Sequence, residues 1–219
     1  MTWEALWPEP LRAAAPYRGR DLTDLAADVD ALLAVCGRAV IREHVPRVAG
    51  EAELLARRFG VDPVAAREAA LMHDLGGTVS REGMVALSEQ LGLPVLPGER
   101  RVPLLLHAGL SAVIAQRRYG VRDPAVLQAI RVHTTLHARP TPLDLTLFLA
   151  DKLEWDQGGV PPYGAELRRA LDGGLPAGVR WMLMWLASPQ ARLLIPHPDL
   201  RAAWAAFGIQ PPVPTSGEA

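Results

Sequence analysis

Ionisable side chains follow two of the most apolar stretches of the chain. His73 and Asp74 come directly after residues 65–72, and Asp151 comes directly after residues 145–150. An ionisable group at the end of a buried helix is costly to bury unless a partner compensates its charge. A metal ion is such a partner, so these three side chains are candidate metal ligands.

Imidazole nitrogen and carboxylate oxygen together are typical donors to iron, manganese or zinc ions. Four of the six histidines, together with two aspartates, could serve two such ions. Cys36 is the only cysteine, which excludes an internal disulfide and a cysteine-based zinc site and favours a reducing compartment. The candidate metal ligands are His44, His73, Asp74, His107, His133 and Asp151.

The segments that must position these side chains have the periodicity of helices. Apolar residues recur three and four positions apart in residues 104–119 and 143–153, and no stretch alternates convincingly with period two. Gly60 and Gly120 are typical helix stops. Three helix starts are indicated by a capping side chain before a proline: Asp62-Pro63, Asp123-Pro124 and Thr141-Pro142. We therefore expect an all-α fold.

The helix signals repeat at an offset of about sixty residues. Residues 57–63 are similar to residues 117–124, and each copy reads as the turn of a helical hairpin. The second helix of each hairpin runs to a histidine, and the first helix carries another: His44 with His73, and His107 with His133. The alternative explanation is that the spacing is common among helical hairpins and that the histidines occur there by chance.

Length and charge restrict the function classes. A chain of 219 residues, 49% hydrophobic, fits one domain, for which we expect an N-terminal extension over 1–20, a helical bundle with C-terminal helices over 21–209 and a tail over 210–219. A net charge of -1 makes nucleic acid an unfavourable partner. No secretory signal or membrane span is recognisable, and we expect a cytoplasmic protein without a membrane partner.

The ordered motifs resemble a known family. His44 is followed by Ala70-Leu71-Met72-His73-Asp74, Leu105-Leu106-His107, Ile130-Arg131-Val132-His133-Thr134-Thr135 and Leu149-Ala150-Asp151-Lys152. This set resembles the HD-domain metal-dependent phosphohydrolases, and within their binuclear branch the YqeK family of bacterial symmetrical dinucleoside tetraphosphatases. The resemblance covers about residues 25–190. It implies an HD-domain helical bundle with a binuclear metal site.

The resemblance also implies a ligand set and a reaction. His44, His73, Asp74 and Asp151 would hold one divalent ion, and Asp74, His107 and His133 the second, which makes Asp74 the bridging, catalytic carboxylate. The ions would be iron, with manganese or another transition metal as alternatives. A hydroxide between them would split diadenosine tetraphosphate into two ADP.

The chain departs from the family at three presumed phosphate contacts. Ile41 replaces an arginine, Gly77 replaces a lysine, and Gln157 ends a segment where a further arginine is expected. We therefore consider as substrate contacts Arg42, Arg47, Arg131, Thr134, Thr135 and Lys152, with solvated surface arginines as the alternative explanation for the arginines.

These departures leave several substrates compatible with the sequence. The main expectation is a dinucleoside tetraphosphate, and the alternatives are a nucleoside di- or triphosphate, a nucleotide monoester, or a non-catalytic role as a nucleotide-binding regulator. His137 could replace a missing phosphate contact or lie in a loop after the helix. A nucleotide is the expected partner in each case, and a homodimer is compatible with the sequence.

Overall fold

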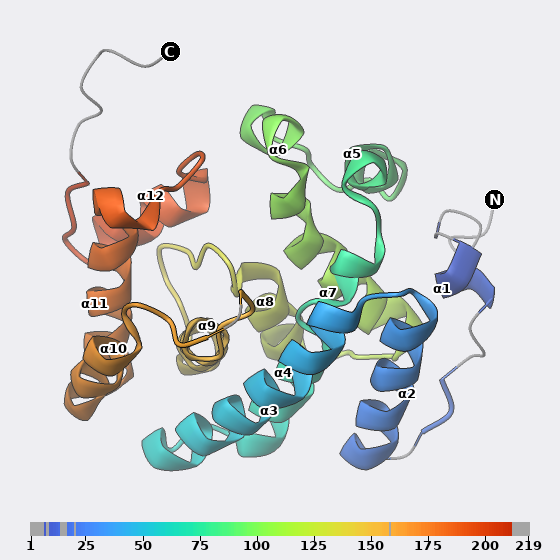
Figure 1. Ribbon diagram of the computed structural model, residues 1–219, viewed down its shortest axis with the longest axis horizontal. Coiled ribbons are helices and arrows are strands. Elements are labelled where there is room, and N and C mark those ends of the chain that lie inside the picture. Colours follow the sequence, from blue (N-terminus) through green and yellow to red (C-terminus); the bar gives the residue numbers. More distant parts are fainter. Residues whose placement is uncertain (1–6, 8, 14–16, 20, 158, 212–219) are drawn as a thin grey trace.

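The computed structural model describes residues 7, 9–13, 17–19, 21–157 and 159–211, and within these ranges every regular element is helical (Figure 1). The expectation of an all-α fold is therefore confirmed. The α-helices and short 3-10 helices (η) are α1 (Glu9–Ala13), α2 (Leu22–Val35), α3 (Ala39–Phe59), α4 (Pro63–Met72), η2 (Leu75–Thr78), α5 (Arg81–Gln90), α6 (Pro97–Arg101), η3 (Pro103–Leu106), α7 (His107–Arg118), α8 (Pro124–Val132), α9 (Pro142–Leu153), α10 (Gly164–Ala170), η4 (Leu171–Gly173), α11 (Leu175–Leu186), η5 (Pro189–Ala191) and α12 (Pro198–Ala206).

The predicted helix ends carry the expected caps. The Asp62 carboxylate accepts hydrogen bonds from the backbone N–H groups of Val64 and Ala65, at 2.8 and 3.3 Å. Asp123 and Thr141 cap α8 and α9 in the same manner. Gly60 ends α3 with a left-handed backbone, φ 70°, that glycine adopts without steric cost.

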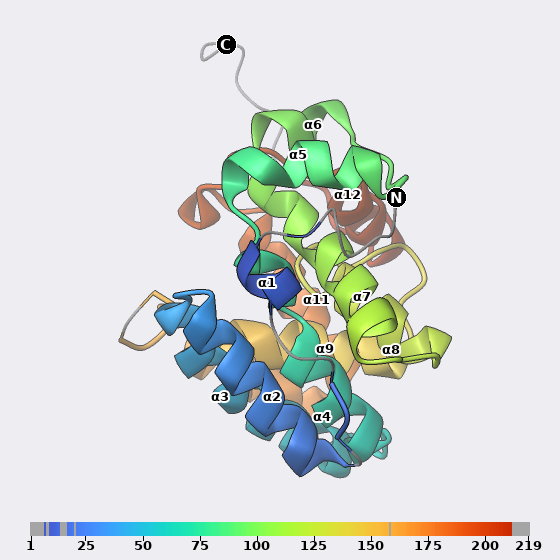
Figure 2. The same cartoon turned by 90° about the vertical axis from the view of Figure 1, so that its right-hand side faces the viewer.

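Two helical hairpins and one central helix form the core. α3 packs on α4, α7 packs on α8, and α9 packs against α3, α4 and α8. Figure 1 shows both hairpins beside α9, with α10 to α12 to the left of α9, and Figure 2 shows α5 and α6 at the top of the molecule. Phe148, Leu147 and Leu149 of α9 are fully buried. The internal repeat of the sequence thus corresponds to two hairpins that share one buried helix.

Two segments differ from a simple reading of the periodicity. Residues 104–119 form η3 and then α7, so His107 is the first residue of α7 rather than an interior one. Part of the N-terminal extension belongs to the core, because Trp7 and Leu11 are buried within it. Residues 1–6, 8, 14–16 and 20 of the extension, and 212–219 of the C-terminal tail, lie outside the described residues.

Among the described helices, none combines the length and the apolar character that crossing a lipid bilayer requires.

Gly76 lies where the backbone of η2 closely approaches the start of α7. Its N–H donates to the Ser111 hydroxyl on α7 at 2.8 Å. A Cβ atom at Gly76 would lie 2.8 Å from the carbonyl carbon of His107 and would collide with that carbonyl oxygen. Backbone atoms cannot swing away as a side-chain tip can, so the contact between η2 and α7 requires glycine.

Gly76→Ala is therefore expected to destabilise the protein by about 1–3 kcal/mol, the usual cost of overpacking. Gly50→Ala is the matched control, because Gly50 lies within α3 and a Cβ there meets nothing within 4 Å. That control should stabilise the protein by about 0.4–1 kcal/mol. Urea unfolding curves measure both changes, and equal stabilities of the two variants would contradict the close approach at Gly76.

Candidate metal centre

The ends of four helices meet at one place in the core. His73 directly follows α4, His133 directly follows α8, and His107 begins α7. Asp151 lies in the last turn of α9 and His44 in the second turn of α3. The structure thus brings together all six candidate ligands, although they span more than a hundred positions of the sequence.

One group of donor atoms lies around Oδ2 of the Asp74 carboxylate. His44 Nε2 lies 3.1 Å from Asp151 Oδ1 and 3.3 Å from His73 Nε2. His73 Nε2 lies 3.6 Å from Asp151 Oδ1. Asp74 Oδ2 completes the group at 3.5 Å from His73 Nε2 and 3.9 Å from His44 Nε2.

A second group surrounds the other oxygen of the same carboxylate. His107 Nε2 and His133 Nε2 are 3.1 Å apart. Asp74 Oδ1 lies 3.2 Å from His107 Nε2 and 3.6 Å from His133 Nε2. Each oxygen of Asp74 therefore faces a different group of imidazoles.

These spacings fit metal coordination. Ligand bonds of about 2.0–2.2 Å place neighbouring atoms of a tetrahedral site about 3.3–3.6 Å apart, and those of an octahedral site about 3 Å apart. The donor atoms of both groups fall in or close to that range. Lone pairs of nitrogen and oxygen point at one another across buried space, an arrangement that is unfavourable unless a cation or a proton lies between them.

Backbone carbonyls orient three of the imidazoles. In each, Nδ1 lies within hydrogen-bond distance of the carbonyl oxygen three residues earlier, which accepts its proton and leaves the Nε2 lone pair for a metal ion. The pairs are His73 with Ala70 (2.7 Å), His107 with Leu104 (2.5 Å) and His133 with Ile130 (2.8 Å). This repeated contact is a general feature of histidines that bind metals.

The titration of the cluster reflects its crowding. Burial lowers the pKa of His73, but the carboxylates of Asp74 and Asp151 outweigh burial and raise it to about 9. Burial dominates for His133, whose pKa is lowered to about 4 with the help of the neighbouring imidazoles. Burial raises the pKa of Asp74, but the imidazoles, His73 foremost, bring it well below its ordinary value. In the absence of an ion, a proton on His73 takes the place of the cation.

Lys152 and Arg47, two of the expected substrate contacts, are engaged with the protein near the cluster. Lys152 Nζ donates to Asp151 Oδ2 at 2.5 Å, which leaves Oδ1 of that carboxylate to face the histidines. Arg47 donates to the carbonyl oxygen of Trp155 at 2.9 Å and pairs with the Glu154 carboxylate at 3.3 Å. Of these two side chains, Lys152 contacts a candidate ligand, whereas the hydrogen-bond and ion-pair partners of Arg47 are not ligands.

The structure does not bring Arg42 to the cluster. Its guanidinium forms a bidentate pair with Asp30 on α2, at 2.6 and 2.8 Å, on a different face of α3 from His44. Arg131 is exposed at the end of α8. The Thr135 hydroxyl donates to the neighbouring carbonyl of Leu136. The structure therefore shows no contact between these three side chains and the candidate ligands.

Thr134 lies at the second group of donors. Its hydroxyl oxygen is 3.0 Å from His133 Nε2 and 3.4 Å from His107 Nε2. Ile41 and Gly77, where the resemblance leads one to expect an arginine and a lysine, touch each other, because a Cβ at Gly77 would collide with Cδ1 of Ile41.

His137 forms an interaction that the sequence analysis did not name. Its Nε2 lies 3.1 Å from the carboxylate of Asp144, which is fully buried and also accepts from the Thr141 backbone N–H at 2.8 Å. The helix has ended before His137, and Leu136 has a left-handed backbone with φ 58°. The signal for Asp144 was present in the sequence, as the third residue after the capping Thr141.

A helical bundle that gathers four imidazoles and two carboxylates at one place has the donors of a metal-binding protein. The HD domain family matches residues 41–156, more than half of the chain. The chain belongs to this family of metal-dependent phosphohydrolases, and the resemblance stated from the motifs is confirmed.

Two relatives illustrate the similarity. The chain is 36% identical over 135 residues to a Lactococcus lactis subsp. cremoris protein described as an uncharacterized protein in the pepC 5' region, covering 62% of this chain and 68% of the relative. It is 34% identical over 111 residues to the symmetrical bis(5'-nucleosyl)-tetraphosphatase of Bacillus subtilis. That match covers 51% of this chain and 59% of the Bacillus protein.

A solved structure shares the fold. The crystal structure of a Clostridium acetobutylicum protein, described as a predicted HD superfamily hydrolase involved in NAD metabolism, superposes with a TM-score of 0.67 at 24% identity. The superposition covers 75% of this chain and 87% of the other.

Stripping divalent ions from the protein is expected to lower its melting temperature, because an ion bound only by the folded state stabilises that state. Restoring the ion at a thousandfold excess over its Kd should add about 4 kcal/mol, or roughly 10 °C for a domain of this size. Differential scanning calorimetry of the stripped and restored protein measures the shift.

Asp74→Asn should abolish most of this shift, because one carboxylate faces both groups of donors. Asp172→Asn is the control, since that carboxylate is exposed and pairs with Arg58 far from the cluster. An undiminished response of the Asp74 variant would exclude this carboxylate as a ligand.

Proposed function

We propose that the protein hydrolyses dinucleoside tetraphosphates symmetrically, converting diadenosine tetraphosphate into two ADP. The observation that carries the proposal is the Asp74 carboxylate, whose two oxygens face two separate groups of donors. The Bacillus subtilis relative, named for this activity, adds support for the substrate. The matched part of this chain spans 59% of that relative's length.

We further propose two divalent ions, one held by His44, His73, Asp74 and Asp151 and the other by Asp74, His107 and His133. Iron is the ion we propose, since mixed imidazole and carboxylate donors suit it, with manganese as the alternative. Such ions supply phosphoanhydride cleavage with a water molecule acidic enough to attack phosphorus and with positive charge for the phosphoryl oxygens.

The residues of the chain have separate tasks in this proposal. Asp74 bridges the two groups and is the catalytic carboxylate. Lys152 holds Oδ2 of Asp151, so that Oδ1 is kept toward the histidines. The Thr134 hydroxyl, next to His107 and His133, is placed to donate a hydrogen bond to a phosphoryl oxygen.

Incubation of the metal-loaded protein with diadenosine tetraphosphate is expected to yield ADP as the only nucleotide product, as measured by ion-exchange chromatography. Asp74→Asn should lower kcat by at least about a hundredfold, because metal-assisted attack and charge neutralisation are lost together. Asp172→Asn should retain the activity.

Equal amounts of ATP and AMP would overturn the symmetrical assignment while leaving a hydrolase. Hydrolysis of nucleoside triphosphates without cleavage of diadenosine tetraphosphate would replace the substrate. Tight binding of the dinucleotide without turnover would indicate a regulator instead of an enzyme.

Elemental analysis of protein purified without oxygen should find two ions per chain, mainly iron. His107→Ala should retain about one ion, because the donors around Asp74 Oδ2 remain complete. His137→Ala is the matched control, since His137 contacts Asp144 and none of the proposed ligands, and it should retain both ions. Two ions in the His107 variant would refute the proposed division of the ligands.

A further inference from the structure

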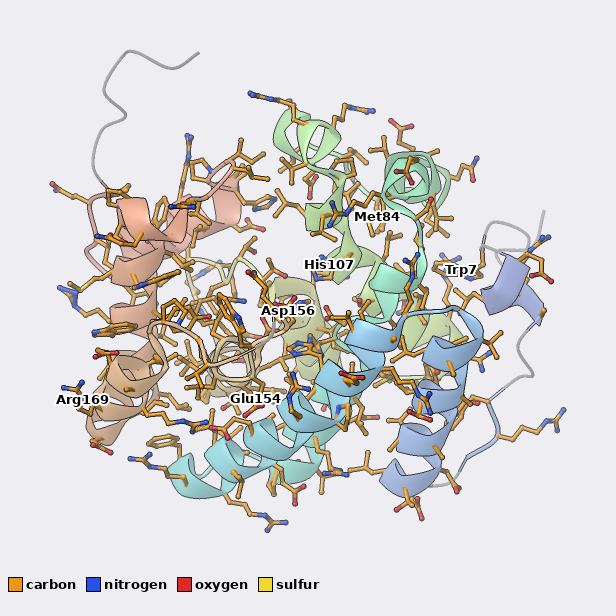
Figure 3. All side chains as sticks on the ribbon, viewed as in Figure 1. Trp7, Met84, His107, Glu154, Asp156 and Arg169 are labelled. Carbon is orange, nitrogen blue, oxygen red and sulfur yellow. The ribbon has the colours of Figure 1, made fainter. Side chains whose placement is uncertain are left out.

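A cavity of about 760 Å³ lies between the first turns of α3, the helix that carries His44, and the segment that follows α9, the helix that carries Asp151. Its lining includes Val40, Glu43 and Arg47 from α3, and Trp155, Asp156 and Val160 from that segment. Glu43 directly precedes the ligand His44, and residues 153–156 follow the ligand Asp151 within five positions. Figure 3 labels Glu154 and Asp156, which belong to the segment that follows α9.

The charged side chains of this cavity that have no ion-pair partner among the described residues are carboxylates. The carboxylates of Glu43 and Asp156 are exposed, and among the described residues neither forms an ion pair. Arg47, the one basic side chain in the lining, is already engaged by the Glu154 carboxylate and the Trp155 carbonyl. A phosphate would be repelled here, whereas a ligand part that donates hydrogen bonds would be favoured.

The cavity also has apolar walls. Val40 is 61% exposed and Val160 is 85% exposed, and both line it. Trp155 is half-buried, and its ring meets the buried ring of Tyr163 edge-on, with centroids 5.7 Å apart. The Tyr163 hydroxyl donates to the Lys152 carbonyl at 3.1 Å, which ties this aromatic pair to the end of α9. A flat heterocycle would cover the exposed apolar surface.

We propose that this cavity binds one nucleoside of the substrate, its base and ribose, while the phosphates lie at the metal centre. A purine nucleoside matches both features, because its ribose hydroxyls and exocyclic amine donate to carboxylates and its ring is apolar and flat. The volume lies within the range of small-molecule pockets, about 300–1,000 Å³. The inference rests on the proposed nucleotide substrate and assigns the part of the substrate that this surface recognises.

Val40→Trp tests the assignment by filling the cavity from the wall formed by α3. Val64→Trp is the matched control, because Val64 is also the second residue of its helix, is 60% exposed, and lies at the opposite end of α4 from His73. Val160→Trp fills the cavity from the other wall. All three positions are exposed, so the substitutions are compatible with folding.

Both cavity variants should raise KM for diadenosine tetraphosphate by about tenfold or more, the size expected from losing the contacts of one base. Isothermal titration calorimetry with adenosine, a probe without phosphate, should show a comparable loss of affinity. The Val64 variant should stay within about twofold of the unmodified protein in both measurements.

The two proposals fail in different ways. Cleavage of diadenosine tetraphosphate with KM and adenosine affinity unchanged in both cavity variants would overturn the nucleoside site and leave the proposed function intact. Absence of cleavage would overturn the proposed function, and the calorimetry would still decide whether adenosine binds in this cavity.

Discussion

The structure depends on compensating two largely buried carboxylates. Asp74 and Asp151 lie among four imidazoles with their lone pairs directed inward, and such an arrangement is stable only with a cation or protons between the groups. The surrounding helices serve this requirement. α4 and α8 end at the cluster, α7 begins there, and α9 delivers its carboxylate in its last turn, so the ligands come from stiff elements held by the core.

One local device is repeated around the cluster. His73 and His133 each follow the last residue of a short helix, and each points Nδ1 at a carbonyl of the preceding turn. The carbonyls near a helix end have no intrahelical donor, so they are free to accept from an imidazole. His107 uses the carbonyl of Leu104 in η3 for the same purpose. The two copies of the sequence repeat therefore share the helical hairpin and also the hydrogen bond that orients the imidazole at its end.

Local signals predicted the ends of the helices, and the resemblance indicated the six side chains that meet in the structure, whereas other contacts between distant segments escaped prediction. Caps at Asp62 and Thr141 and the glycine stop at Gly60 act within a few residues, so the sequence shows them directly. Arg42 was expected at the substrate because it lies near His44 in sequence. Its actual partner, Asp30, lies on the preceding helix, and only the packing of α2 on α3 brings the two together.

The positions and partners of the basic side chains indicate which groups near the cluster are available to bind phosphate. Arg42 and Arg47 are bound to carboxylates, and Lys152 is bound to a proposed ligand. Ile41 and Gly77, where the resemblance leads one to expect an arginine and a lysine, contact each other and carry no charge. A polyphosphate at the cluster would therefore meet positive charge mainly through bound ions. Phosphate binding and metal binding should then be linked, because the bound cations supply the positive charge that attracts the phosphate. Each should strengthen the binding of the other by the same factor.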